Sequence, residues 1–409
     1  MANVSSSNGL EKRPKLRFPG FDEPYRTTHL GEIATLVNRT DPKSNAPIMM
    51  LSAGNGFIMQ SVKYSRDNAG QSLKKYILLK QGELAYNHGA SKAKQFGCCY
   101  ELTEPEARIP YVYHCFKVSD TEYTPFVAAT LNNPKMDKQL KRLVSSSVRM
   151  DGLLNISFDD YMSVSLHLPS FAEQKKIADF LKKLDERITA QEMLVASLKK
   201  YKRGVMQRIF RQTATQEGEV WSCVRLGDVF KKISRRNTNG MVKNVITNSA
   251  EYGLIPQRDF FDKDIAVDGN TANYYIIEEG DFVYNPRKSN TAPYGPFNRY
   301  TLSERGIISP LYTCLVLQAD INPSYLAWYF RSDAWHRYIY DNGSQGVRHD
   351  RVSMTDDLLM GIPVMFPDRT KQLLYAETLD KIEVRLQAAQ KEYELLVSMK
   401  DGCVQQLFI

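Results

Sequence analysis

The chain has 409 residues, of which 43% are apolar and 24% charged, and its formal net charge is +8. This length predicts two or three domains, and the composition is that of a folded globular protein. We expect the polar residues 1–16 to form a disordered tail rather than a signal peptide, and no apolar run is long enough to span a bilayer. A cytoplasmic protein is therefore expected. The cysteines lack metal-ligand spacing, which argues against a zinc site and a disulfide framework.

The sequence repeats itself at a shift of 198 residues. Residues 169–210 align with 367–408 without a gap, and twelve of these 42 positions are identical. Residues 76–89 align with 274–287 at the same shift, so that Tyr86 and Asn87 fall on Tyr284 and Asn285. Chance similarity between two helices would not extend to strand-like and loop-like segments, so we infer a duplicated domain pair.

In chain order, each half begins with a mixed globular part and ends in a long helix. The first globular part covers residues 17–168 and the second 221–366. The apolar runs at 76–79, 111–118, 274–277 and 311–317 predict short strands, because turn-forming residues separate them. A shorter helix is expected near Pro125–Asn132 and another at Pro323–Tyr340.

The first long helix is expected at residues 169–211, followed by a linker at 212–220, and the second at 367–409. Ser170 and Glu173 have the spacing of a capping box, and Asp368 is a candidate N-cap for the second helix. Forty helical residues would rise about 60 Å.

Apolar residues recur along both helices in alternating steps of three and four, which is typical of a coiled-coil seam. In the first helix the seam consists of Ile177, Leu181, Leu184, Ile188, Val195, Leu198, Val205 and Ile209. In the second it consists of Tyr375, Leu379, Ile382, Leu386, Ala389, Tyr393, Leu396, Cys403 and Leu407. Lys202 and Lys400 occupy matched seam positions, where a lysine can specify register or extend to solvent. The alternative is two amphipathic helices packed on separate cores.

Together these patterns predict an α+β fold. Two duplicated mixed α/β domains would be joined by two long helices that form an antiparallel coiled coil, with the halves related by a pseudo-twofold axis.

Sequence motifs for catalysis are missing. The chain has no phosphate-binding loop, no dinucleotide-binding glycine motif, no nucleophile elbow and no metalloprotease motif. The amino-methyltransferase box is also missing, because Asn285-Pro286 is followed by Arg287. We therefore expect a chain that does not catalyse a reaction alone.

Basic and polar residues instead gather in matching loops after the repeated strands. Arginine can read guanine and asparagine can read adenine, while lysine and backbone N–H groups hold phosphates. The candidate DNA-binding residues are Asn87, His88, Lys92, Lys94, Arg149, Asn285, Arg287, Lys288, Asn290, Arg348, His349 and Arg351. The alternative is ordinary polar loops, and Arg149 and Arg348 could form internal salt bridges. A basic run between Lys199 and Arg211 is either a solvated face or a phosphate-attracting one.

The sequence resembles the specificity subunit of type I restriction–modification enzymes. The resemblance rests on residues 16–33, on the central helix text at 168–210, on the opening of the second half at 221–229 and on the weaker terminal copy at 362–408. It covers almost the whole chain after residue 16.

The resemblance implies two target-recognition domains that each read half of a bipartite, asymmetric DNA site, with the helices as spacer. The implied partners are double-stranded DNA, two modification subunits and restriction subunits. This chain would bind no cofactor, because S-adenosylmethionine, ATP and Mg²⁺ belong to the partner subunits. The second helix lacks the counterpart of Glu173, so equivalent docking of both modification subunits is in question. A coiled-coil scaffold or inhibitor without DNA specificity is the competing interpretation.

Overall fold

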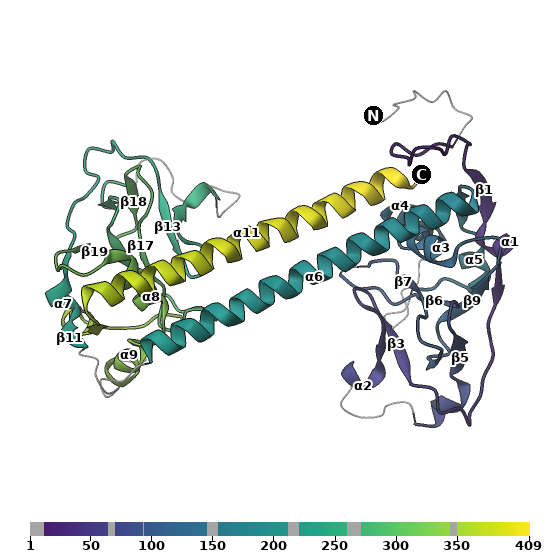
Figure 1. Ribbon diagram of the computed structural model, residues 1–409, viewed down its shortest axis with the longest axis horizontal. Coiled ribbons are helices and arrows are strands. Elements are labelled where there is room, and N and C mark those ends of the chain that lie inside the picture. Colours follow the sequence, from purple (N-terminus) through teal and green to yellow (C-terminus); the bar gives the residue numbers. More distant parts are fainter. Residues whose placement is uncertain are drawn as a thin grey trace. The chain divides into compact units, whose positions relative to one another are not determined.

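The computed structural model describes residues 12–63, 70–92, 94–144, 154–211, 221–259, 271–343 and 350–409. The chain divides into two compact units. Unit 1 combines Met1–Glu192 with Lys391–Ile409, and unit 2 is Met193–Gln390. Each unit therefore contains one half of each long helix (Figure 1).

The globular part of unit 1 mixes short strands and short helices. Its strands are β1 (Arg26–His29), β2 (Ala34–Leu36), β3 (Met49–Ser52), β4 (Gly56–Met59), β5 (Ile77–Lys80), β6 (Leu84–Asn87), β7 (Cys98–Glu101), β8 (Glu106–Ile109), β9 (His114–Val118) and β10 (Ser165–Leu168). Its helices are α1 (Leu30–Ile33), α2 (Gln60–Lys63), the 3₁₀ helix η1 (Gly70–Lys75), α3 (Thr124–Leu131), α4 (Pro134–Leu143) and α5 (Phe158–Met162).

The globular part of unit 2 follows nearly the same order. Its strands are β11 (Ser222–Arg225), β12 (Phe230–Lys232), β13 (Ile246–Ser249), β14 (Gly253–Pro256), β15 (Tyr275–Ile277), β16 (Phe282–Tyr284), β17 (Phe297–Arg299), β18 (Gly306–Ile308), β19 (Thr313–Leu317) and β20 (Pro363–Phe366). Its helices are α7 (Leu226–Val229), the 3₁₀ helix η2 (Gln257–Asp259), α8 (Pro323–Arg331), α9 (His336–Asn342) and α10 (Asp356–Met360).

The two units share one sheet topology. A four-stranded antiparallel sheet has the order β2-β9-β6-β7 in unit 1 and β12-β19-β16-β17 in unit 2. The two-stranded pairs β1-β10, β3-β4 and β5-β8 return as β11-β20, β13-β14 and β15-β18. This matched pairing confirms the duplication that the sequence predicts.

The predicted short helices differ in outcome. Helix α3 lies where the sequence predicts it, but the second predicted helix is divided into α8 and α9. Ser332 ends α8 in an extended conformation, and its hydroxyl donates to the Tyr329 carbonyl at 2.6 Å. This break turns Trp335 into the core, where it is 1% exposed.

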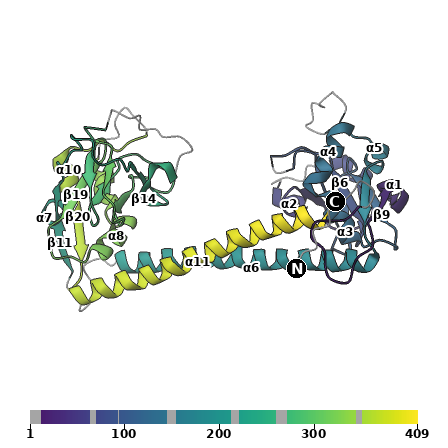
Figure 2. The same ribbon diagram turned by 90° about the horizontal axis from the view of Figure 1, so that it is seen from above.

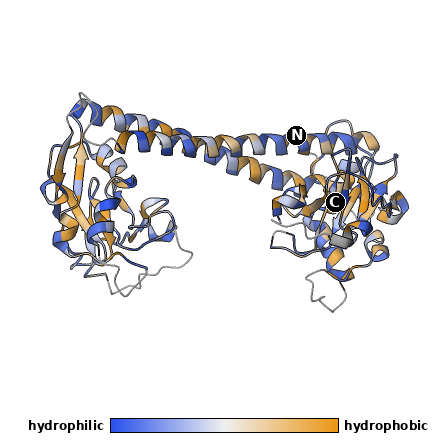
Figure 3. Cartoon of the chain, turned by 90° about the horizontal axis from the view of Figure 1, so that it is seen from below, coloured by the Kyte–Doolittle hydropathy of each residue, from blue (hydrophilic) through white to orange (hydrophobic). Residues whose placement is uncertain are grey.

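The long helices are α6 (Phe171–Phe210) and α11 (Arg369–Leu407), and they run antiparallel beside each other within each unit (Figure 2). Figure 3 shows alternating hydrophobic and hydrophilic bands along both. Most of the predicted seam is buried, namely Ile177, Leu181, Leu184, Val195, Leu198, Leu379, Ile382 and Leu386, while Ile188, Tyr393 and Leu396 are half-buried. The predicted antiparallel coiled coil is confirmed. No helix of the described residues is long and apolar enough to cross a membrane.

Ion pairs join the two helices at the seam lysines. Lys202 Nζ lies 2.8 Å from a Glu383 carboxylate oxygen in unit 2, and Lys400 Nζ lies 2.5 Å from Asp185 in unit 1. The two pairs are related by the 198-residue shift, with acid and base on exchanged helices. The lysines are therefore paired across the seam rather than extended to solvent.

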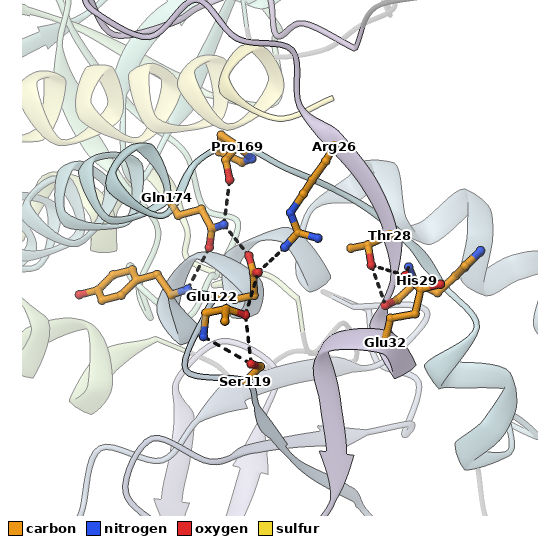
Figure 4. Close-up of polar contacts among 10 residues, drawn as sticks. Arg26, Thr28, His29, Glu32, Ser119, Glu122, Pro169 and Gln174 are labelled. Atoms are coloured by element: carbon orange, nitrogen blue, oxygen red, sulfur yellow. Dashed lines mark hydrogen bonds and ion pairs between the residues drawn. The ribbon is translucent and has the colours of Figure 1, made fainter.

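The helix starts are held by buried glutamines. Gln174 accepts from the Tyr123 N–H at 2.9 Å and donates to the Pro169 carbonyl and to Glu122 at 3.0 and 2.7 Å (Figure 4). Glu122 also pairs with Arg26 of β1. In unit 2, Gln372 accepts from the Asn322 N–H and donates to the Pro367 carbonyl, both at 2.8 Å.

The cap predictions have opposite outcomes. Asp368 accepts from the Lys371 N–H at 3.1 Å, which confirms it as the N-cap of α11. The capping box at α6 is wrong, because the fully buried Glu173 binds elsewhere. Its two carboxylate oxygens accept from Arg17 at 2.9 and 2.8 Å, and one also accepts from Tyr25 at 3.4 Å. The Glu173 carboxylate raises the pKa of Arg17 in this pair.

Candidate nucleic-acid interface

The candidate site lies where the central strands β6 and β16 end. The Asn87 side chain accepts from the Gly89 N–H, and the Asn285 side chain accepts from the Arg287 N–H, both at 2.9 Å. Asparagine favours such turns because its side chain can replace a backbone acceptor two residues away. The same turn therefore opens the loop in both units.

We call residues 87–97 and 285–295 the strand-end loops. Each is closed by the tyrosine before the asparagine: the Tyr86 hydroxyl donates to the Phe96 carbonyl at 2.6 Å, and that of Tyr284 donates to the Tyr294 carbonyl at 2.8 Å. Each loop ends in a glycine with a φ of 84° or 85°, Gly97 and Gly295. A Cβ atom would lie 2.3 Å or 2.0 Å from the carbonyl oxygen of the asparagine, so only glycine fits.

The strand-end loops bind the chain segments that follow residues 145–153 and 344–349. In unit 1, the Leu154 N–H donates to the His88 carbonyl at 2.8 Å. In unit 2, Lys288 N–H donates to Asp350 and Val352 N–H to Pro286, at 2.9 and 2.8 Å. Arg149, Arg348 and His349 lie outside the described residues. Other predicted residues do lie together within each unit. In unit 1, His88, next to Asn87, bonds to the segment that begins at Leu154. In unit 2, Lys288 bonds to Asp350, and Arg287 lies opposite Arg351 in a β-bridge.

The unit 2 loop presents cationic and polar side chains. Arg287 and Asn290 are exposed, and Lys288 and Arg351 are half-buried. Arg287 and Arg351 face each other in an antiparallel β-bridge. Burial raises the pKa of the nearby Tyr312, and the charges of Arg287 and Arg351 partly oppose that shift. Asp350, 3.9 Å from Arg351, offsets part of the positive charge.

The unit 1 loop differs in what it exposes. Lys92 is exposed, and Lys94 is half-buried with its ammonium group donating to the Asn132 carbonyl at 2.8 Å. Asn87 is half-buried in its turn. The two loops thus share a scaffold but differ in charge and in hydrogen-bonding groups.

Two of the predicted DNA contacts are buried and bond within the protein. His88 is 5% exposed, and its ring nitrogens lie 2.8 Å from the Leu154 carbonyl and 3.0 Å from the Val112 carbonyl. Asn285 is 7% exposed, and within the described part of the chain its amide bonds to the backbone groups of Arg287 and Asn248. We therefore assign both residues to holding the loops in place. Their chemistry alone could not distinguish this role from base reading.

An aromatic cluster that the sequence analysis missed supports the unit 1 loop. The Tyr86 and Tyr161 rings stack at 3.8 Å, and the His88 and His114 rings lie 5.0 Å apart. His114 Nε2 lies 2.9 Å from the Ile156 carbonyl. Burial lowers the pKa of His114 and raises that of Tyr161 well above its usual range. Within the described ranges, no group of three or more His, Cys, Asp or Glu side chains could hold a metal ion.

Gly97 and Gly295, which close the loops, were also missed. They are separated by the same 198 residues as the aligned tyrosines and asparagines, so the repeat itself could have indicated them.

Comparisons with known proteins agree with this architecture. No protein-family model matches the sequence, and no curated protein matches it. A chain from a structure of a type I restriction–modification system, titled for its complex assembly and conformational transition, is 16% identical, with 96% of this chain and 99% of that one covered and a TM-score of 0.52. The specificity subunit from M. genitalium is 13% identical, with 97% and 99% covered and a TM-score of 0.58.

The specificity subunit from Thermoanaerobacter tengcongensis is 14% identical, with 97% and 98% covered and a TM-score of 0.45. The alignments to the first two structures extend over nearly the full length of both chains. Because the sequence identity is low, these structures show a likeness of fold alone. That likeness agrees with the resemblance seen in the sequence. The chain thus has the fold of type I restriction–modification specificity subunits, with two mixed α/β domains and a coiled coil.

Proposed function

We propose that this chain is the DNA-recognition subunit of a type I restriction–modification complex. Each globular part reads one half of a bipartite DNA site, and the two helices set the spacer and dock the modification subunits. The observation that carries the proposal is the pair of strand-end loops. They share the asparagine turn, the tyrosine closure and the glycine, yet they present different side chains. One scaffold with two sets of reading groups favours an asymmetric target.

The groups in unit 2 suit direct base reading. The exposed Arg287 can donate two hydrogen bonds to guanine, and Asn290 can pair with adenine. We propose that Lys288 and Arg351 neutralise phosphates, because phosphate contacts position a protein on DNA without specifying sequence. In unit 1 the exposed Lys92 supplies the phosphate contact. Arg149, Arg348 and His349 remain predicted contacts on sequence grounds.

Helix α11 offers a surface for a partner subunit. Leu373 and Val384, both in unit 2, are exposed and eleven residues apart, which is three helical turns, so they form one stripe away from the seam. The matched positions on α6 are Lys175 and Glu186. We assign this stripe to a modification subunit. Because α6 lacks a matching apolar stripe, the second copy would bind less tightly.

Val384→Asp tests this docking surface. It should lower the number of modification subunits bound, as counted by native mass spectrometry, because it places a charge in the apolar contact. Glu186→Asp, at the matched position on α6, is the control and should leave the count unchanged. A wild-type count with Val384→Asp would exclude the stripe as a docking surface.

The chain itself is proposed to be non-catalytic and to bind no cofactor. S-adenosylmethionine, ATP and Mg²⁺ would bind the modification and restriction subunits. Methylation should therefore require the modification subunit in every assay. Methylation by the isolated chain would contradict this part of the proposal.

Mapping methylated bases in the genome of a host that expresses the chain with its modification subunit tests the function. The expected result is one motif of two unlike halves around a fixed unspecified spacer. Replacing residues 221–366 with the same domain of another specificity subunit should change one half only. No new motif, in a complex that still forms, would favour the coiled-coil scaffold.

Point variants test the loop contacts in the same complex. Arg287→Ala should cost about 1–3 kcal/mol of binding and relax one position of one half-site. Lys288→Ala should weaken binding to all DNA sequences equally. It should also reduce the salt dependence of the affinity, because a phosphate contact releases counterions. Lys231→Ala, an exposed lysine on β12, is the control. Wild-type binding by both loop variants would place the DNA surface elsewhere.

A further inference from the structure

A tight turn precedes the strand next to the central strand in both units. In unit 1 it comprises residues 110–113, and the Tyr113 N–H donates to the Pro110 carbonyl at 3.1 Å. In unit 2 it comprises residues 309–312, and the Tyr312 N–H donates to the Ser309 carbonyl at 3.1 Å. The turns connect β8 to β9 and β18 to β19, so they are equivalent in the duplicated fold.

Each turn exposes one large hydrophobic side chain. Tyr111 is 50% exposed and Leu311 is 60% exposed. Turn positions usually carry glycine, proline, asparagine, aspartate or serine, because these residues suit the backbone or satisfy its polar groups. A single exposed apolar residue needs no explanation by itself. Two of them on equivalent turns, Tyr111 at the second turn position and Leu311 at the third, indicate a shared use of this turn.

Both turns lie beside the strand-end loops. The register pairs Tyr86 with His114 and Tyr284 with Thr313, so the turn before each partner strand meets the end of the central strand. In unit 1, His88 Nε2 lies 3.0 Å from the Val112 carbonyl within the turn. In unit 2, burial raises the pKa of Tyr312 in the turn, and the positive charges of Arg287 and Arg351 in and beside the strand-end loop oppose this shift.

Positive charge lies near the turn in both units. Lys75 Nζ lies 5.8 Å from the centre of the Tyr111 ring. In unit 2, Leu311 precedes Tyr312, whose pKa the charges of Arg287 and Arg351 lower against the effect of burial. An apolar side chain among phosphate-binding groups suits a duplex, whose grooves expose base edges and thymine methyl groups between two charged backbones.

We propose that Tyr111 and Leu311 are the non-polar base contacts of the two half-sites, packing on base edges with thymine methyl groups as the preferred partner. This inference rests on the proposed function and adds specificity-determining residues that the sequence analysis did not include. The contact excludes water from the groove and discriminates by shape, whereas Arg287 discriminates by hydrogen bonds. Each turn acts on its own half-site.

The test uses the chain in complex with its modification subunit and duplexes that carry the methylated motif. Tyr111→Ala and Leu311→Ala should each weaken binding of the motif by about 5- to 150-fold, the range of a lost base contact. The slope of affinity against salt should stay at the wild-type value, because no phosphate contact is lost. Tyr111→Phe should bind as wild type, and Leu36→Ala, at an exposed leucine on β2, should have no effect.

Modified DNA identifies the contacted group. Replacing thymine by uracil, one position at a time, removes only the methyl group. At one or more positions of a single half-site, this should weaken the wild-type complex and leave the Leu311→Ala complex unchanged. Full affinity of both alanine variants, or an equal loss on duplexes without the motif, would overturn the inference.

The two proposals can fail separately. A wild-type complex that prefers no DNA sequence would overturn the proposed function and this inference together. A wild-type complex that prefers its motif while the turn variants bind normally would overturn the inference alone.

Discussion

Gln174 and Gln372 show how much of each unit depends on one buried amide. Both are at most 3% exposed, and both link the start of a long helix to the loop that precedes a short helix, α3 or α8. Gln174 has a further bond, to the buried carboxylate of Glu122. A buried polar group that loses its partner carries the full cost of its desolvation. The two glutamines are therefore matched but unequal.

Gln174→Ala should destabilise the chain by about 1–3 kcal/mol, because it leaves Glu122 and the Tyr123 N–H without this partner. Gln372→Ala should cost less, since the partners that it leaves unpaired among the described residues are neutral backbone groups. Lys175→Ala, at the exposed neighbouring position, is the control. Denaturant unfolding of the full chain measures all three. A larger loss for Gln372→Ala than for Gln174→Ala would contradict this ranking.

His114 makes unit 1 sensitive to acid. Burial lowers its pKa, and the neighbouring His88 acts in the same direction, while the bond to the Ile156 carbonyl opposes the shift. Tyr86, Phe158 and Tyr161 are the other rings around it. The folded chain therefore binds the proton less readily than the unfolded chain, whose histidine has a pKa near 6.5. Stability from this group is present above that value and is lost as the pH falls below it.

Lowering the pH from about 7.5 to about 5.5 should therefore lower the protection of amides in residues 154–162, which His114 holds, once the observed exchange rates are divided by the intrinsic rates at each pH. His114→Gln keeps a donor for the Ile156 carbonyl and removes the titration, so its protection should depend less on pH. Hydrogen exchange read by mass spectrometry gives the comparison. Equal pH dependence in both proteins would assign the effect to other groups.

Helices α6 and α11 carry equivalent ion pairs as well as equivalent apolar seams. Lys202 with Glu383, and Lys400 with Asp185, repeat one ion pair with the helices exchanged. All four side chains are partly exposed, so each pair contributes little free energy by attraction alone. Their larger effect is on register, because a shifted seam would bring other groups opposite each lysine.

Lys202→Glu should lower the melting temperature of the chain, because it places two carboxylates together and removes the lysine 5.9 Å from the Trp328 ring. Adding Glu383→Lys should restore part of the loss by rebuilding the pair with reversed charge. Lys199→Glu, exposed on the same helix, serves as the control. A double variant no more stable than Lys202→Glu would mean that the two residues are not coupled.

The helices and turns could be predicted from the sequence where residues close together in the chain determine them. The helices, expected at 169–211 and 367–409, are observed at Phe171–Phe210 and Arg369–Leu407, because a seam of four to five heptads is a long and regular signal. The Ser170–Glu173 box failed, because Glu173 binds Arg17, 156 residues earlier. Tyr111 and Leu311 open the apolar runs at 111–118 and 311–317, which predict strands, so their exposure in turns could not be foreseen.

The whole molecule is more interwoven than its repeat suggests. Leu407 and Phe408, at the end of the second repeat, lie in the core of unit 1, where Phe408 stacks on Phe126 at 5.3 Å. Ile209 and Phe210, at the end of the first repeat, lie in the core of unit 2. Neither repeat completes its core with its own residues. The chain passes from unit 1 to unit 2 after Glu192 and back after Gln390, positions that are again 198 residues apart.

These crossing points are the natural place to test the helices as a spacer. Inserting four helical residues after Glu192 and four after Gln390 lengthens both helices by about 6 Å and keeps the seams nearly in phase. One base pair occupies about 3.4 Å of the DNA axis. The methylated motif should therefore gain one or two unspecified base pairs between unchanged half-sites. A matched insertion of two residues rotates each seam by about 200° and should abolish methylation, because the apolar faces no longer meet. An unchanged spacer with full activity in the four-residue variant would mean that the helices do not set the distance between the half-sites.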